Sequence, residues 1–158
     1  MLIGIISDTH IPDRANILPK KVIDEFSNVD LIVHCGDVTS PQVLNELKDL
    51  SKVVAVKGNM DYLELPRKEI LDIDGIKIGI IHGDIIYPRG DTLKLKYLGL
   101  EMGVDILISG HTHTPLIEKQ KDILLLNPGS PTTPRCPIKS IMKLEIEDKK
   151  INANLIPI

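Results

Sequence analysis

Runs dominated by apolar residues alternate with amphipathic segments in the first third of the chain. The apolar runs occupy residues 2–6, 30–33 and 52–56. Each run is typical of a strand buried on both faces. Residues 19–26 have helical spacing, and Ser40 followed by Pro41 marks the start of a second helix that continues to Leu50. The order strand, helix, strand, helix, strand predicts a sheet with crossover helices.

The rest of the chain favours hairpins and one further helix. Asp74-Gly75 is a strong hairpin signal, and Gly103 ends a helical pattern that begins at Asp91. The expected elements are strands at 70–72, 76–81 and 104–108, a helix at 91–102, and hairpins within 116–126 and 138–158. We therefore expect one domain spanning residues 1–158, with an α/β fold in which a two-sheet β sandwich is flanked by helices.

Composition narrows the classes of function. Hydrophobic residues make up 42% of the chain but aromatic residues only 3%, so the core must be aliphatic. The net charge is −3, and no block of Lys and Arg is long enough to indicate a nucleic-acid arm or groove. No apolar run approaches the ~18 residues of a membrane span. Cys35 and Cys136 lack Cys-x-x-Cys spacing, so we expect a reduced, cytoplasmic protein, and a homo-oligomer stays open.

Polar residues with metal-binding chemistry follow five of the predicted strands. They are Asp8 and His10, Asp37, Asn59, His82, and His111 and His113. Sheets with crossover helices place their ligands beyond the carboxyl ends of the strands, which is where these residues fall. Residues i and i+2 of an extended segment project to the same side, so His111 and His113 are expected to face one site.

This residue set is too large for one tetrahedral zinc ion. It suits two divalent ions that share a bridging carboxylate, and its mixed N and O ligands indicate Mn, Fe, Zn or Ni. Simpler explanations stay open for single members, since Asp8 could cap a turn and the glycines after the strands could serve packing alone. His34 lies inside a strand and is interpreted as a hydrogen-bonded residue that supports the site.

The full motif set resembles the calcineurin-like metallophosphoesterase superfamily over nearly the whole chain. The motifs are Asp8-x-His10, Gly36-Asp37, Gly58-Asn59, His82 and Gly110-His111-Thr112-His113. The short length, Gly58-Asn59-x-Asp61 and Asn127-Pro128-Gly129-Ser130 are similar to the small YfcE-type phosphodiesterase branch. The resemblance implies a four-layer α/β/β/α fold. It also implies that one metal is held by Asp8, His10 and His113, the other by Asn59, His82 and His111, and that Asp37 bridges them.

The resemblance implies a binuclear phosphodiesterase in which a metal-bound hydroxide attacks the phosphorus of a small phosphodiester. Mn²⁺ is the expected metal, with Ni²⁺, Fe²⁺ and Zn²⁺ as alternatives, and two such ions can activate a shared water. Asp37, Asn59 and His111 are the catalytic candidates. A phosphomonoesterase is one alternative. The other is a non-catalytic scaffold, because His10-Ile11-Pro12 and Tyr87-Pro88-x-Gly90-Asp91 also resemble the retromer small subunit.

Two positions depart from the superfamily pattern. Met60 stands where phosphatase and nuclease members carry a histidine used as general acid. This predicts either slow turnover except with good leaving groups or an acid supplied from elsewhere. Asp84 replaces the second histidine of a frequent His-Gly-His motif. It could repel an anionic substrate, bind a metal, support a histidine or be a solvated acid. Asp61 is expected beside the ligands.

Arginines supply the positive charge that a phosphate ester needs besides metal. Arg14, Arg89 and Arg135 lie on predicted loops at the motif side and are the substrate-binding candidates. An arginine in such a loop is more often a plain surface charge. Asn127-Pro128-Gly129-Ser130 is either a structural turn or a support for the site.

Overall fold

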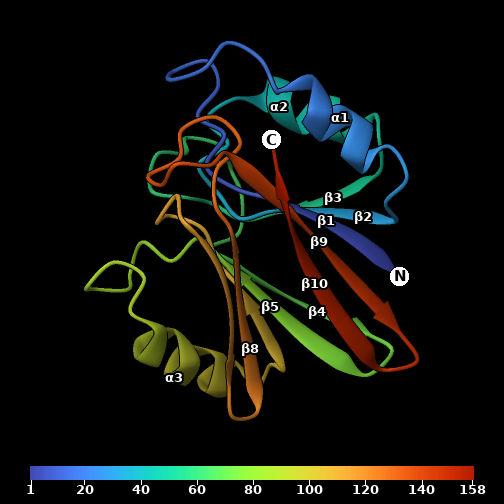
Figure 1. The fold of residues 1–158 in the computed structure, drawn as a ribbon. Helices are drawn as coiled ribbons and strands as arrows, with labels where there is room; N and C mark the ends of the chain where they lie inside the picture. The colour runs from blue at the N-terminus through green and yellow to red at the C-terminus, as the bar shows by residue number, and fades with distance from the viewer.

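Two five-stranded mixed β-sheets face each other at the centre of the molecule (Figure 1). The computed structural model describes residues 1–158. The first sheet has the strand order β10-β9-β1-β2-β3. Its strands are β1 (Leu2–Ile6), β2 (Leu31–His34), β3 (Lys52–Ala55), β9 (Ser140–Glu147) and β10 (Lys150–Pro157). The three strands nearest the N-terminus run parallel, as the crossover pattern predicts.

The second sheet has the order β4-β5-β6-β8-β7. Its strands are β4 (Lys68–Ile73), β5 (Ile76–Ile81), β6 (Ile106–Ile108), β7 (Pro115–Gln120) and β8 (Ile123–Pro128). The central strands β5, β6 and β8 are parallel, and the antiparallel strands β4 and β7 close the two edges. Central strands of this kind are buried on both faces, which explains their nearly continuous apolar runs.

Helices cover the outer face of each sheet and complete the expected four-layer α/β/β/α arrangement (Figure 1). The helices are α1 (Lys20–Phe26), α2 (Pro41–Lys48) and α3 (Thr92–Met102). The first two pack on the first sheet through Val22, Phe26 and Leu47, among others. Leu95 of α3 packs on the second sheet with Ile123. None of the three helices is both long and apolar enough to cross a lipid bilayer.

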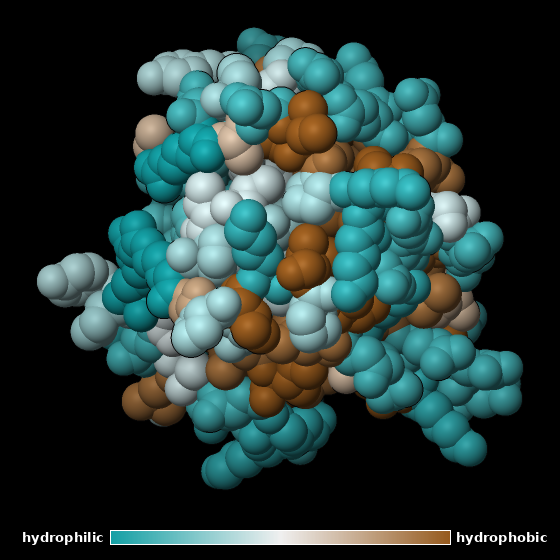
Figure 2. All heavy atoms as spheres, turned by 45° about the horizontal axis from the view of Figure 1, so that its top comes forward, coloured by the Kyte–Doolittle hydropathy of each residue, from teal (hydrophilic) through white to brown (hydrophobic).

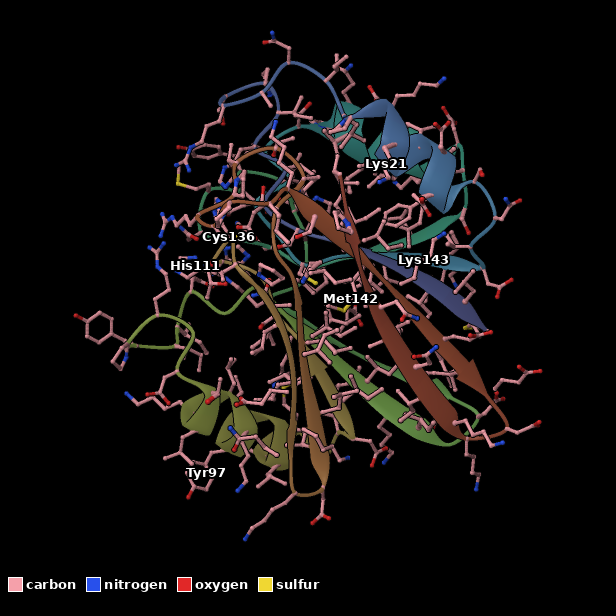
Figure 3. All side chains as sticks on the ribbon, viewed as in Figure 1. Lys21, Tyr97, His111, Cys136, Met142 and Lys143 are labelled. Carbon is pink, nitrogen blue, oxygen red and sulfur yellow. The ribbon has the colours of Figure 1, made fainter.

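The main core lies between the two sheets and is aliphatic, as the composition predicts. Ile5 and Val33 of the first sheet and Ile80 and Ile108 of the second are completely buried in one cluster. Met142 of β9 belongs to the same cluster, and Figure 3 shows it between the sheets. The surface in Figure 2 is mostly hydrophilic, with apolar side chains in separate patches. The sandwich therefore provides a rigid support for the loops that follow its strands.

Several strand boundaries differ from those predicted. Strand β8 continues beyond Leu126 through Asn127 and Pro128, because β7 begins at Pro115 and pairs with it over that stretch. Strand β4 begins at Lys68, which pairs with Ile81, whereas apolar patterning indicates only its central part. Pairing with a neighbouring strand extends both elements into residues that the hydrophobic pattern alone does not mark.

Candidate metal and phosphate site

Five of the seven expected ligands adopt a left-handed backbone conformation. Their φ angles lie between 45° and 68°, at Asp8, His10, Asp37, His111 and His113. Residues other than glycine adopt this conformation rarely, and it clusters at functional sites. The segment that carries His111 and His113 is therefore not extended, as was expected, but both rings still line one cavity. The chain turns sharply here, and the two rings belong to different ligand groups.

The first cluster gathers Asp8, His10, Asp37 and His113, all buried. Its potential ligand atoms lie within 4.8 Å of one another. Nε2 of His10 is 3.4 Å from Oδ2 of Asp37, and Nε2 of His113 is 3.2 Å from Oδ1 of Asp8. The rings of His10 and His113 are stacked with 5.1 Å between their centroids. This is the residue group expected around one ion.

The second cluster contains Asp37, His82 and His111. Nε2 of His82 lies 3.3 Å from Oδ2 of Asp37, 3.0 Å from Oδ1 of Asn59 and 3.2 Å from Nδ1 of His111. Asn59 therefore joins the group through its amide oxygen. Oδ2 of Asp37 is the atom close to both clusters, as a bridging ligand would be.

Hydrogen bonds on the far side of two rings fix which nitrogen faces the site. Nδ1 of His82 donates to the carbonyl of Cys35 at 2.7 Å, and Nδ1 of His113 donates to the carbonyl of Thr133 at 2.6 Å. Each Nε2 is then the unprotonated nitrogen of the neutral ring and points toward the carboxylates. A backbone carbonyl behind a histidine is the usual support of a metal ligand.

The residues present fit divalent metal ions. Three buried polar atoms in the first cluster have no hydrogen-bond partner: Oδ1 of Asp8 and both ring nitrogens of His10. Buried polar groups are nearly always paired, so orphaned atoms need an explanation. Here Nε2 of His10 lies 3.9 Å from Oδ1 of Asp8, too far for a hydrogen bond. Ligand atoms that converge on a common ion have this arrangement, and their N and O chemistry suits a first-row divalent metal.

The carboxylate of Asp37 is held ionised by its surroundings. Burial raises the pKa of Asp37, but the hydrogen bond and charge of His82 and the Met60 amide outweigh it, so the pKa falls to about 2. Burial lowers the pKa of His82, and the bond to Asp37 with the charges of both aspartates raises it to about 9. In the metal-free chain a protonated His82 thus balances part of the acidic charge that a metal would otherwise balance.

Asp61 supports Asp37 and its neighbours by accepting hydrogen bonds from three backbone N–H groups. Its Oδ2 accepts from Asp37 at 2.9 Å and from Gly58 at 2.8 Å, and its Oδ1 accepts from Thr39 at 2.7 Å. The loop after β2 is thereby joined to the loop after β3, at a point where a side chain at Gly58 would collide with Asp37. Asp61 therefore lies beside the ligands, as expected, and contacts their backbone.

His34 is completely buried at the end of β2 and lies behind the site. Its Nδ1 accepts from the N–H of Gly36 at 3.2 Å, so its Nε2 is the donor to Thr9 Oγ1 at 3.1 Å. Burial lowers the pKa of His34 to about 3, which keeps the ring neutral. His34 belongs to neither cluster and orders the loops that carry Asp8 and Asp37.

The end of β8 and the loop after it support the site, a role that the sequence left undecided. Asn127 donates to the carbonyl of Gly110 at 2.9 Å, and Ser130 donates to the carbonyl of Asp8 at 2.8 Å. Thr132 donates to the carbonyl of Thr9 at 2.8 Å. Sequence reasoning missed Thr132 and Thr133, since hydroxyl residues in a proline-rich loop carry no periodic signal. Their position after a central parallel strand is the one clue to their role.

All three candidate arginines line the cavity over the ligands. This cavity of about 100 Å³ is bounded by Arg14, Arg89 and Arg135 together with His10, Asp37, Asn59, Met60, His111 and His113. His111 lies at the loop end of the sandwich, beside the segment that carries Cys136 (Figure 3). None of the three guanidinium groups forms a salt bridge with an acid. The fourth arginine, Arg67, pairs with Asp84 at 3.4 Å.

Met60 and Asp84, the two residues that depart from the superfamily pattern, differ in their distance from the ligands. Met60 is 40% exposed and borders the cavity, so the missing acid is not replaced at this position. Asp84 is directed to Arg67 and is a member of neither ligand cluster. Its negative charge acts on His111 only from a distance.

Comparison with known proteins identifies the family of the chain. Residues 1–149 match the model of the calcineurin-like phosphoesterase superfamily domain. The chain belongs to this superfamily. A probable metallophosphoesterase of Methanocaldococcus jannaschii is 75% identical over 158 residues, which are 100% of this chain and 82% of the relative.

Two solved structures of the superfamily fold are similar over essentially their whole length. Vps29 of Entamoeba histolytica, in complex with Zn²⁺, is 29% identical with a TM-score of 0.85 and covers 99% of both chains. A novel archaeal phosphodiesterase is also 29% identical, with a TM-score of 0.74 over 99% of this chain and 100% of that one. The four-layer fold expected from the sequence is confirmed.

Proposed function

We propose that this chain is a phosphodiesterase that works with two divalent metal ions. The position of Asp37 carries the proposal, because its Oδ2 lies 3.4 Å from His10 and 3.3 Å from His82, in the two separate ligand clusters. Asp8, His10 and His113 would hold one ion, and Asn59, His82 and His111 the other. Divalent ions in such a pair supply Lewis-acid activation of water and of the phosphoryl group. Mn²⁺ is the first metal to test, followed by Ni²⁺, Fe²⁺ and Zn²⁺.

The arginines would bind and orient the phosphate ester. A guanidinium group presents paired N–H donors that match two phosphate oxygens. Arg14, Arg89 and Arg135 border the same cavity and are free of acidic partners. They would hold the non-bridging oxygens while water adds to phosphorus and one alcohol leaves, giving a phosphomonoester and the alcohol.

The side chain of Met60 leaves the departing alkoxide without a proton donor at that position. Methionine carries no ionisable proton, so the alkoxide would take its proton from solvent through the open cavity. This restricts fast turnover to esters of acidic alcohols. Asp37 cannot serve in its place, because a pKa of about 2 keeps its carboxylate ionised.

The enzyme hypothesis is favoured over the two alternatives by different observations. A scaffold does not need a complete ligand set, whereas every expected ligand of this chain is present and brought to the site. A diester is favoured over a monoester by the likeness to an archaeal phosphodiesterase over the full length of both chains.

Cys35 and Cys136 are unpaired, in keeping with the reducing cytoplasm.

Hydrolysis of bis(p-nitrophenyl) phosphate by metal-stripped protein, with and without added Mn²⁺, tests the proposal. We expect release of p-nitrophenolate only with metal, and a loss of ~100-fold or more in Asp37→Asn. Asp122→Asn, in the exposed turn between β7 and β8, is the matched control and should hydrolyse like wild type. Inactivity of the metal-loaded wild type, or equal rates in Asp37→Asn, would reject the enzyme. A higher kcat/KM for p-nitrophenyl phosphate would indicate a monoesterase.

A further inference from the structure

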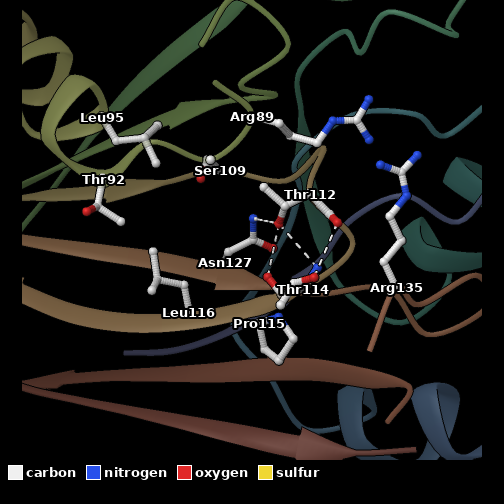
Figure 4. A pocket seen from close by; sticks show the side chains of 11 residues that line it. Arg89, Thr92, Leu95, Ser109, Thr112, Thr114, Pro115, Leu116, Asn127 and Arg135 are labelled. Atoms are coloured by element: carbon white, nitrogen blue, oxygen red, sulfur yellow. Dashed lines mark hydrogen bonds between the residues drawn. The ribbon is translucent and has the colours of Figure 1, made fainter. Parts of the chain in front are cut away.

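A second and larger cavity opens beside the metal and phosphate site. It measures about 350 Å³ and shares Arg89 and Arg135 with the cavity over the ligands. Figure 4 shows these two arginines on one side and Leu95 and Leu116 on the other. A group that enters this cavity would thus be attached to a phosphate held by the same arginines. The size is at the lower end of ligand pockets, which are typically ~300–1,000 Å³.

The walls of this cavity combine free hydroxyl groups with aliphatic surface. The hydroxyl of Thr112 already has a hydrogen-bond partner, because it accepts from the side-chain amide of Asn127 at 3.1 Å. Thr92 and Ser109 also line the cavity, and Figure 4 draws no hydrogen bond between their hydroxyls and the surrounding side chains. Leu95 and Leu116 supply the apolar surface. Two unused hydroxyls beside leucine side chains can bind a ligand that has both hydroxyl groups and C–H faces.

Aromatic side chains are missing from the lining of this cavity. A nucleobase or aryl group is usually held by stacking on such rings, with a gain of ~1–3 kcal/mol per base. A sugar needs hydrogen-bond partners and aliphatic contacts instead. The lining therefore favours a hydroxyl-bearing, non-aromatic group of sugar size.

We propose that this cavity binds the retained ester arm of the phosphodiester, and that this arm is a sugar-sized group with free hydroxyls. The inference rests on the proposed phosphodiesterase function and names its substrate class. Arg89 and Arg135 hold the phosphate at the junction, Thr92 and Ser109 bond to the hydroxyls of the arm, and Leu116 packs on its C–H face. A methyl ester leaves the cavity empty.

Three diesters with the same p-nitrophenolate leaving group test this assignment, since they differ only in the arm that is retained. The arms are methyl, phenyl and methyl riboside, and kcat/KM is measured for each with Mn²⁺. We expect the riboside ester to exceed the methyl ester by about tenfold, the scale of one good pocket contact, and to exceed the phenyl ester as well.

Two substitutions at neighbouring positions of β7 separate the cavity from general effects. Leu116→Trp fills the cavity and should bring the riboside-to-methyl ratio to about one. Ile117 is 48% exposed and absent from the cavity lining, so Ile117→Trp should keep the wild-type ratio. Thr92→Val removes one free hydroxyl with little change in shape and should lower the ratio about threefold. Circular dichroism and Tm establish that each variant is folded.

The outcomes distinguish this inference from the proposed function. Equal kcat/KM for all three diesters, or an unchanged ratio in folded Leu116→Trp, would overturn the cavity assignment and leave the phosphodiesterase intact. The highest kcat/KM for the phenyl ester would overturn the sugar-like arm. If metal-loaded wild type hydrolyses none of the three, the phosphodiesterase proposal fails and this inference fails with it.

Discussion

Nε2 of His113 lies 3.2 Å from Oδ1 of Asp8, yet the two atoms form no hydrogen bond. Both residues are buried and Oδ1 of Asp8 has no hydrogen-bond partner, which favours an ion between the two side chains. We predict that Mn²⁺ at ~100 times its Kd stabilises metal-stripped protein by ~2.7 kcal/mol. That gain corresponds to a rise in Tm of roughly 5–10 °C for a domain of this size. Scanning calorimetry with and without Mn²⁺ measures it, and a Tm that does not change with Mn²⁺ would contradict it.

His111 and His113 are expected to serve different ions although they are close in sequence. His113 belongs to the cluster with Asp8, and His111 to the cluster with His82. Each single substitution, His111→Ala or His113→Ala, should therefore lower the metal content from about two ions per chain to about one. Elemental analysis after equilibration with Mn²⁺ gives the stoichiometry. If the double variant still retained one ion, the two histidines would share a metal.

Asp61→Asn should loosen the site without removing a ligand. An amide keeps one acceptor but turns an N–H₂ group toward one of the three backbone N–H groups that the carboxylate accepts. We expect a loss of about 1–3 kcal/mol in the free energy of unfolding, together with weaker Mn²⁺ binding. Asp30→Asn is the matched control, because its exposed carboxylate accepts only the N–H of Leu2, far from the ligands. Chemical denaturation and metal titration of both variants measure the effect. Equal losses in the two would argue against a positioning role.

Sheets with crossover helices place their ligands beyond the carboxyl ends of the strands, and this rule predicts much of the site from sequence. Parallel strands of both sheets end at the same side of the sandwich, so residues as distant as Asp8 and His111 meet, and the N–H of His111 donates to Asp8 at 2.9 Å. The left-handed backbone was not predictable from apolar patterning, because it depends on contacts from other loops. A side chain at Gly110, for example, would collide with Ser7.

The residues that support the ligands, and the second cavity, could not be predicted from the sequence for a similar reason. The carboxylate of Asp61 and the hydroxyl of Ser130 form hydrogen bonds with backbone groups. Every residue has such groups, so the partner's residue type does not reveal the bond. The second cavity is lined by residues of several separate segments, among them Thr92, Ser109 and Leu116. Only the pairing of β6, β7 and β8 brings the last two together.

Acid should destabilise the protein in part through His34. A histidine with a folded-state pKa of about 3 binds protons more weakly than the unfolded chain, whose histidine has a pKa near 6.5. Its stabilisation is present above pH ~6.5 and is lost as the pH falls toward 3. We expect the Tm of metal-stripped wild type to fall between pH 6.5 and 4.5, and His34→Asn to fall less over that interval. Parallel Tm–pH curves for the two proteins would show that another group is responsible.

Met60→His should restore a proton donor at the edge of the cavity. Met60 borders the ligands, and its backbone N–H, which a substitution retains, donates to Asp37 at 2.9 Å. A general acid contributes typically ~10²–10⁴-fold to departure of a poor leaving group. We therefore expect the variant to gain at least about tenfold in kcat for phenyl diesters and little for p-nitrophenyl diesters, whose phenolate needs no proton. Met60→Leu controls for the change in side-chain shape. If the histidine variant kept the wild-type dependence of kcat on leaving-group pKa, a histidine at position 60 would not be the proton donor.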